Sequence, residues 1–305
     1  MKVVVAGGTG FVGKSLVERL AADGHQVAVL TRDLDRARQR LGVLAELVRW
    51  DAERRGPWER SLNGSDAVVN LAGASVADAR WTSARKRRLV ESRLNATRAL
   101  VTASTEAADK PSVLVNASGV GFYGAGDDRM LDEQADPGTG FLAELSAAWE
   151  AETGWGQARG MRVVRLRIGM VIERDGGALP RMVLPFRLFM GGPVMPGTQW
   201  ISWIHRADLV GLIMWALMNP PLSGPVNAVA PNPVTMTDFC RTVGKVLARP
   251  SWFPVPESLL NLALGEMGSL MTTGQRVSPV KALSAGYHFQ YPTLEPALQA
   301  IFSKG

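Results

Sequence analysis

MKVVVAGGTGFVG, residues 1–13, decides the fold of this chain. The run Lys2–Ala6 predicts a short buried strand, and Gly7, Gly10 and Gly13 then give the spacing G-x-x-G-x-x-G at the start of a helix. A backbone without side chains lets a pyrophosphate approach closely, and the helix directs its free N–H groups and the positive end of its dipole at the phosphates. Because the glycines stand between a strand and an amphipathic helix, the stretch predicts a dinucleotide-binding site.

The second strand is expected over residues 25–32, HQVAVLTR, and its end predicts which dinucleotide binds. NAD-binding proteins hold the ribose 2′-hydroxyl with an acidic residue at this point. Here the strand ends in Thr31 and Arg32, with Arg36 just beyond, and a guanidinium suits a 2′-phosphate. We therefore expect NADP(H). In the alternative interpretation, Asp33 turns inward to bind the ribose and the arginines form a solvated helix face.

The composition is that of an ordinary globular protein, with 305 residues of which 46% are hydrophobic and 20% are charged. The single cysteine, Cys240, excludes an intrachain disulfide and a thiolate metal cluster, and it fits a reducing cytoplasm. The three histidines show no metal-ligand spacing, so no metal is expected. The chain begins with a strand rather than a signal peptide, and its apolar runs are too short to span a bilayer. We expect a cytoplasmic protein without a membrane partner.

The net charge is +6, and much of the excess lies in the run Arg80–Arg98. Nucleic-acid binding is disfavoured because the run lacks interleaved aromatic residues and no nucleic-acid module is visible. A solvated helix face explains most of these residues, while one or two of them, such as Arg93, can bind a phosphate or carboxylate of a ligand. We expect a small-molecule substrate and no nucleic-acid partner. The sequence leaves open whether the chain forms a homodimer.

Strand-like and helical runs alternate through the first half of the chain, which predicts a parallel sheet with helices on both faces. After Gly169 the alternation breaks into short pieces, and the tail from Pro254 onward predicts three short helices. We expect an α/β fold, a Rossmann-type doubly wound parallel sheet with a smaller C-terminal substrate lobe. Further strands are expected over residues 47–50, 67–71, 112–118 and 162–168, and long helices over 83–108 and 141–156. The expected domains are 1–169 for NADP binding, with part of 200–230 returning to the sheet, and 170–305 for the substrate, including a helical domain at about 253–300.

Several segments resemble the extended short-chain dehydrogenase/reductase superfamily. They are GGTGFVG (7–13), NLAG (70–73), NASGVGFYG (116–124) and WIHRAD (203–208). Longer segments are similar to the atypical "epimerase family" of that superfamily, namely RWTSARKRRLVESRLNATRAL (80–100), FLAELSAAWE (141–150), GGALPRM (176–182) and QWISWIH (199–205). The tail over residues 253–298 resembles the small C-terminal domain of the same family.

The resemblance implies further cofactor contacts. The turn after the fourth strand lines the cofactor, Asp51 resembles the residue that contacts the adenine amino group, and Ser118 fits the family's hydroxyl position on the fifth strand. The helix that carries Arg93 faces the cofactor side. The complete set of expected cofactor-binding residues is Gly7, Gly8, Thr9, Gly10, Phe11, Val12, Gly13, Thr31, Arg32, Arg36, Asp51, Leu71, Ala72, Gly73, Arg93 and Ser118.

The catalytic pair of ordinary superfamily members is missing. These members carry a tyrosine and, four residues later, a lysine on the helix after the fifth strand, so that both side chains lie on one face. The lysine lowers the pKa of the tyrosine, which then exchanges a proton with the substrate. No tyrosine of this chain is followed by lysine at that spacing, and the segment FLAELSAAWE places Leu142 and Ser146 at the two positions. We expect Leu142 to lie beside C4 of the nicotinamide.

Three functions remain open. The first is an NADP(H)-dependent oxidoreductase or epimerase-like enzyme with a relocated acid, for which the candidates are Tyr123, Ser118 and Glu144. Each has a structural alternative, since Tyr123 can be a packed tyrosine, Ser118 a strand-end cap and Glu144 a first-turn acid that complements the helix dipole. The second is a non-catalytic NADP(H)-binding redox sensor or regulatory protein. The third is a nucleotide-sugar epimerase, which the missing pair disfavours.

Overall fold

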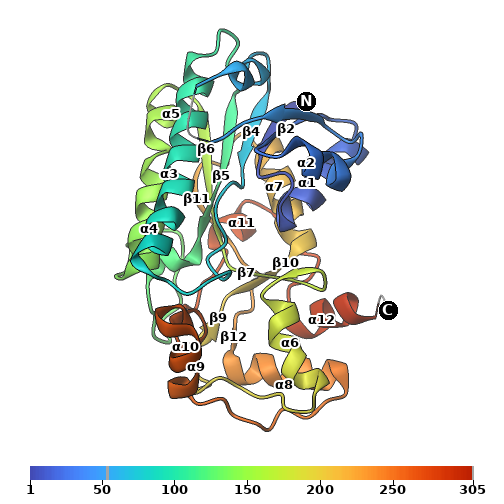
Figure 1. Cartoon of the computed structure of the whole chain (residues 1–305), viewed down its shortest axis with the longest axis vertical. Coiled ribbons are helices and arrows are strands. Elements are labelled where there is room, and N and C mark those ends of the chain that lie inside the picture. The colour runs from blue at the N-terminus through green and yellow to red at the C-terminus, as the bar shows by residue number, and fades with distance from the viewer. Residues whose placement is uncertain (53–54, 304–305) are drawn as a thin grey trace.

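The computed structural model describes residues 1–52 and 55–303, which form a central seven-stranded sheet with helices on both faces (Figure 1). Every pairing in this sheet is parallel, and the strand order is β11-β6-β5-β4-β1-β2-β3. The expected Rossmann-type α/β fold is confirmed. The strands are β1 (Lys2–Ala6), β2 (Gln26–Thr31), β3 (Glu46–Arg49), β4 (Ala67–Asn70), β5 (Val113–Gly119), β6 (Arg162–Ile168) and β11 (Gly224–Ala228).

The side chains of each strand enter two different hydrophobic cores in alternation. On β1, Val3 and Val5 pack against α1 and α7, whereas Val4 and Ala6 pack against α3. Successive side chains of a strand point to opposite faces, so a strand covered on both sides is apolar throughout. The helices around the sheet are α1 (Phe11–Ala22), α2 (Leu34–Leu41), α3 (Ser83–Glu106), α4 (Phe141–Ala151), α5 (Gly154–Ala158) and α7 (Arg206–Met218).

The chain after β6 builds a smaller body with its own core, which contains Trp203, Phe239 and Leu298. Its strands are β7 (Met170–Glu173), β8 (Gly176–Gly177), β9 (Trp200–Ile201), β10 (Trp203–His205) and β12 (Val234–Thr235). Its helices are α6 (Leu179–Arg187), α8 (Met236–Leu247), α9 (Glu257–Leu264), α10 (Ser269–Thr272) and α12 (Leu294–Phe302). The short helix α11 (Val280–Ser284) packs against β11 of the central sheet instead. The 3-10 helices of the described chain are η1 (Pro57–Ser61), η2 (Val120–Tyr123) and η3 (Gly265–Gly268). No helix in the described part of the chain is long and apolar enough to cross a membrane.

The helical boundaries differ from the sequence prediction in two places. The helix expected over residues 141–156 ends at Ala151, and the separate helix α5 follows. Thr153 Oγ1 donates a hydrogen bond to the Glu150 carbonyl oxygen at 2.7 Å, which gives that carbonyl a partner outside the regular helical hydrogen bonds. The glycines of α5 also lower the helix propensity of this segment. Within the described residues the tail contains α9, η3, α10, α11 and α12 instead of three short helices, because Gly265 and Gly268 bound a separate 3-10 turn there.

Candidate functional site

The loop between β1 and α1 is closed by contacts that only glycine allows. Gly7 adopts a left-handed φ of 81°, and a Cβ on it would lie 2.7 Å from the carbonyl carbon and oxygen of Leu71. A Cβ on Gly13 would lie 2.1 Å from the Gly7 carbonyl oxygen, and one on Gly8 would lie 2.9 Å from the Val29 methyl groups. These glycines therefore hold the loop against β2, against the turn after β4 and against itself.

Gly10 differs from Gly7, Gly8 and Gly13 because it faces open space. It is exposed, and a Cβ on it would meet only the Gly7 carbonyl oxygen, at 3.1 Å. Gly10 is the N-cap of α1, and the first N–H groups of a helix have no partners within it. A pyrophosphate can approach these N–H groups over Gly10. Beside them, Arg40 Nη1 donates a hydrogen bond to the Thr9 carbonyl oxygen at 2.6 Å.

The side chains of Phe11 and Val12 face the protein. Val12 packs against the core shared by α1 and α7. Phe11 lies under β8, since a Cβ on Gly176 would be 2.5 Å from its ring, and the Arg206 guanidinium lies 5.0 Å from the ring centroid. The β7–β8 hairpin of the smaller body is therefore packed beside the glycine loop.

The end of β2 presents arginines rather than a free carboxylate. Asp33 is the N-cap of α2, and its Oδ1 accepts a hydrogen bond from the Arg36 backbone N–H at 3.0 Å. Thr31 is buried, and its Oγ1 accepts from the Asp33 backbone N–H at 3.3 Å. Arg32 and Arg36 are exposed. The Asp33 carboxylate is therefore used in capping α2, which disfavours the alternative in which it binds ribose. Asp51 is exposed directly after β3, beside the end of β2.

The turn after β4, with Leu71, Ala72 and Gly73, is held by a buried amide network. Asn70 Oδ1 accepts from the Ala72 backbone N–H at 3.1 Å, and Asn70 Nδ2 donates to Asn116 Oδ1 at 2.7 Å. Because Asn70 and Asn116 are paired residues of β4 and β5, the two side chains lie side by side. Thr97 of α3 and Trp149 of α4 complete the network, in which Asn70 Nδ2 and Trp149 Nε1 both donate to Thr97 Oγ1, at 2.9 Å and 2.8 Å. This network fixes the turn against the glycine loop.

Ser118 lies at the end of β5, where its hydroxyl joins a buried ion pair. Its Oγ donates to Glu150 Oε1 at 2.8 Å. Glu150 of α4 accepts two hydrogen bonds from Arg167 of β6, from Nε at 2.9 Å and from Nη2 at 3.0 Å. The side chains of Arg167 and Glu150 are only 5% and 9% exposed. A serine has one hydroxyl proton, and this one is directed into the protein.

Tyr123 lies at the end of η2 and is 5% exposed. Its hydroxyl oxygen accepts from Arg167 Nη1 at 3.0 Å, and it lies 2.7 Å from Asn227 Oδ1 and 2.9 Å from the Asp132 carbonyl oxygen. Burial raises the pKa of the Tyr123 phenol above its usual value, although Arg167 opposes the shift. All the hydrogen-bonding capacity of the phenol is used within the protein.

The other candidate positions lie on α4 and α3. Glu144 is exposed in the first turn of α4. Leu142 is partly buried in an apolar cluster with Trp81 and Leu145, and a Cβ on Gly121 would lie 3.0 Å from its Cβ. The position that carries tyrosine in ordinary superfamily members is therefore apolar here. Arg93 of α3 lies beside Gly73, where a Cβ would be 3.4 Å from its Cγ and Cζ.

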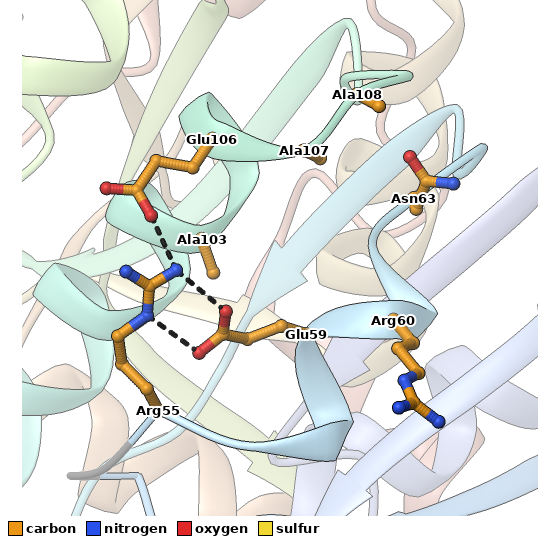
Figure 2. A pocket seen from close by; sticks show the side chains of 8 residues that line it. All are labelled: Arg55, Glu59, Arg60, Asn63, Ala103, Glu106, Ala107 and Ala108. Carbon is orange, nitrogen blue, oxygen red and sulfur yellow. Dashed lines mark hydrogen bonds and ion pairs between the residues drawn. The ribbon is translucent and has the colours of Figure 1, made fainter.

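A surface pocket lies at the opposite end of α3 from the glycine loop (Figure 2). Arg55 reaches across it to Glu59 and Glu106, at 3.0 Å and 2.6 Å. The pocket is near the amino ends of the sheet strands, because Gly64 just before β4 is hydrogen-bonded to Asp109 just before β5. Ligands of parallel α/β sheets bind at the carboxyl ends. The site therefore lies with the glycine loop and not in this pocket.

Several residues that shape the site are not marked by the sequence motifs. Glu150 and Arg167 form the ion pair that holds Ser118, and Arg40 supports the glycine loop. One indication is the segment RVVRLRI (Arg162–Ile168), in which arginines alternate with apolar residues, because an arginine that such a strand buries needs a partner. No comparable signal marks Arg40, which is one of several arginines on α2.

A family model described as "NAD dependent epimerase/dehydratase family" matches residues 3–228. The chain belongs to this family. The NAD-dependent epimerase/dehydratase model spans the central sheet, and a second model, "Domain of unknown function (DUF1731)", matches residues 255–301, which contain α9 to α12. The resemblance to the atypical epimerase family with its small C-terminal domain is confirmed.

Relatives in the NAD-dependent epimerase/dehydratase family match along the whole chain. A protein of Arabidopsis thaliana named "Epimerase family protein SDR39U1 homolog, chloroplastic" is 41% identical over 99% of this chain and 86% of its own length. "Epimerase family protein YfhF" of Bacillus subtilis is 40% identical over 99% of this chain and 98% of its own length. The crystal structure of human epimerase family protein SDR39U1, solved with NADPH, has a TM-score of 0.88 and 34% identity, and covers 99% of both chains.

Proposed function

We propose that this protein binds NADP(H) at the carboxyl ends of its central strands and transfers hydride to or from a small substrate without a tyrosine–lysine pair. The observation that carries the proposal is the end of β2, where Arg32 and Arg36 are exposed and Asp33 is used as a helix cap. Two guanidiniums at this point favour a 2′-phosphate over a free hydroxyl. The NADPH in the crystal structure of the human relative supports the same cofactor.

The cofactor is tested by the substitution Arg32→Glu. We expect the dissociation constant for NADPH to rise about 10- to 100-fold, since a hydrogen bond to a charged group contributes about 1.5–3 kcal/mol. The constant for NADH is expected to stay the same or fall. The control is Arg38→Ala, which removes an exposed arginine of α2 that pairs with Asp35. Fluorescence titration of both cofactors decides the matter, and wild-type protein that binds NADH more tightly than NADPH would contradict the proposal.

The hydride-transfer part of the proposal assigns Tyr123 a structural role. Its phenol is buried and held by Arg167 and Asn227, and burial raises its pKa, so it is a poor proton donor and acceptor for a substrate. With Leu142 at the usual tyrosine position, the reaction takes its proton from Glu144 or from solvent.

Tyr123→Phe is therefore expected to keep the rate of NADPH oxidation within about twofold while lowering the free energy of unfolding by about 1–2 kcal/mol, the value of a buried hydrogen bond. The rate is measured on whichever carbonyl, quinone or nucleotide-sugar of a broad panel is turned over. A rate loss of about 100-fold or more with an intact fold would identify Tyr123 as the relocated acid.

A second candidate function is a non-catalytic NADP(H) sensor. It is favoured by the direction of the two buried hydroxyls, because Ser118 donates to Glu150 and Tyr123 is saturated by protein groups. A sensor distinguishes NADPH from NADP⁺ in affinity but consumes neither. If no compound of the panel oxidises bound NADPH, and the dissociation constants of NADPH and NADP⁺ differ, the sensor function is supported in place of the enzyme.

A further inference from the structure

Two half-buried arginines of α3 face the turn after β4. The Arg93 side chain lies along Gly73, and its guanidinium carbon is 5.1 Å from the centroid of the Trp149 ring. Arg85 lies two turns earlier on the same helix and donates from Nη2 to the carbonyl oxygen of Ser75. The two side chains therefore flank one short stretch of backbone at the carboxyl edge of the sheet.

Among the described residues, few of the N–H donors of these two guanidiniums have an acceptor. A guanidinium has five N–H donors. Arg93 uses Nη1 on the Leu89 carbonyl oxygen at 3.1 Å. Arg85 Nε is buried and has no hydrogen-bond partner among the described residues. A buried donor without a partner is costly, and an acceptor brought to the guanidinium offsets that cost.

The charges of the two arginines are also unmatched. Lys86, the neighbouring half-buried base on α3, forms an ion pair with Glu266. Within residues 1–52 and 55–303, neither Arg85 nor Arg93 forms an ion pair with a carboxylate. Burial, together with the positive charge of Arg85, lowers the pKa of Arg93 to about 10. Two like charges held together in this way create a positive potential that attracts an anion.

The Arg93 guanidinium lies between the turn after β4 and the helix α4. The pyrophosphate belongs at the N-terminus of α1, over Gly10. Gly73 follows Ala72 directly in the chain. Ala72 packs against the glycine loop, since a Cβ on Gly7 would lie 2.9 Å from its backbone nitrogen. From there the Arg93 side chain reaches α4, the helix that carries Leu142 at the expected hydride-transfer position. If the nicotinamide lies beside Leu142 as expected, an anionic group bound here belongs to the molecule that reacts with it.

We propose that Arg85 and Arg93 form a subsite for an anionic group of the substrate, a carboxylate or a phosphate. The guanidinium fork matches the oxygens of either group in a bidentate manner. The inference rests on the proposed function, because it needs a cofactor bound beside the subsite.

The test is isothermal titration of NADPH-saturated protein with inorganic phosphate and, separately, with acetate. Wild-type protein is expected to bind at least one of the two anions. The anion that binds more tightly indicates whether the anionic group of the substrate is a phosphate or a carboxylate. The variants Arg93→Met and Arg85→Met keep the length of the side chain and remove its charge, and each is expected to weaken anion binding about tenfold or more. The control is Arg87→Met, an exposed arginine of the same helix, which is expected to bind the anion like the wild type. If one variant fails to fold, the other gives the answer.

The NADPH titration that precedes each experiment separates the outcomes. Variants that keep the wild-type affinity for NADPH but lose the anion support the subsite. Variants that lose NADPH affinity about tenfold assign the arginines to the cofactor and overturn it. Wild-type protein that binds NADPH but neither anion overturns the subsite and leaves the proposed function standing. Protein that does not bind NADPH overturns both.

Discussion

Replacing Gly13 with alanine is expected to lower the free energy of unfolding by about 3 kcal/mol and to weaken NADPH binding about 100-fold or more. The added Cβ would lie 2.1 Å from the Gly7 carbonyl oxygen, 2.8 Å from Gly8 Cα and 2.9 Å from the Gly7 carbonyl carbon. All three atoms are backbone, so no side chain can move aside and the loop itself has to open. Opening the loop displaces the N–H groups that face the pyrophosphate.

Gly10→Ala is the matched control for this prediction. Its Cβ would meet only one atom, at 3.1 Å, and Gly10 has an extended backbone that alanine adopts. We expect stability within about 1 kcal/mol of the wild type but weaker NADPH binding, because the methyl group projects where the pyrophosphate approaches. Urea unfolding and NADPH titration of both variants separate the two roles. A Gly13→Ala protein with normal stability and affinity would contradict the loop geometry.

Removing the Glu150 carboxylate is expected to destabilise the protein by about 3–5 kcal/mol, measured as a loss of unfolding free energy for Glu150→Ala. The substitution strands the Arg167 guanidinium in the interior, where it is only 5% exposed, and removes the acceptor of the Ser118 hydroxyl. The penalty arises mainly from the uncompensated buried charge rather than from the strength of the pair.

The double variant Glu150→Met with Arg167→Met tests that explanation. Two apolar side chains of similar length leave no buried charge, so most of the lost stability is expected to return. Ser118→Ala, in contrast, removes only one hydrogen bond to the carboxylate and is expected to cost about 1.5–3 kcal/mol. A double variant no more stable than Glu150→Ala would show that the pair itself, and not the stranded charge, holds β5, β6 and α4 together.

Much of the fold follows from local patterns in the chain. The run Lys2–Ala6 is apolar throughout because both faces of β1 are covered, and the same holds for the neighbouring central strands. The helix expected over residues 141–156 was too long because the hydrogen bond from Thr153 back to Glu150 is a local competitor that apolar periodicity does not register.

The candidate site could be predicted only in part. The glycine spacing and Arg32 depend on neighbours in the sequence, so the cofactor could be inferred from them. Tyr123 is a candidate acid because it follows β5 in the chain, but Asn227, which its hydroxyl contacts, is on β11, 104 residues away. The sequence does not show that the two meet, and so it could not show that the phenol is already satisfied.

The sequence by itself determined the alternation of strands and helices in the first half of the chain, the cofactor loop with its arginines, and the absence of a tyrosine–lysine pair. These are properties of residues a few positions apart, and backbone geometry converts their spacing directly into structure. Only the tertiary structure decided where the Ser118 proton points, that Arg167 meets Glu150, and that Arg85 and Arg93 flank one turn without a carboxylate partner among the described residues. Those facts depend on how separate helices and strands pack, because burial and charge pairing arise between segments far apart in the chain.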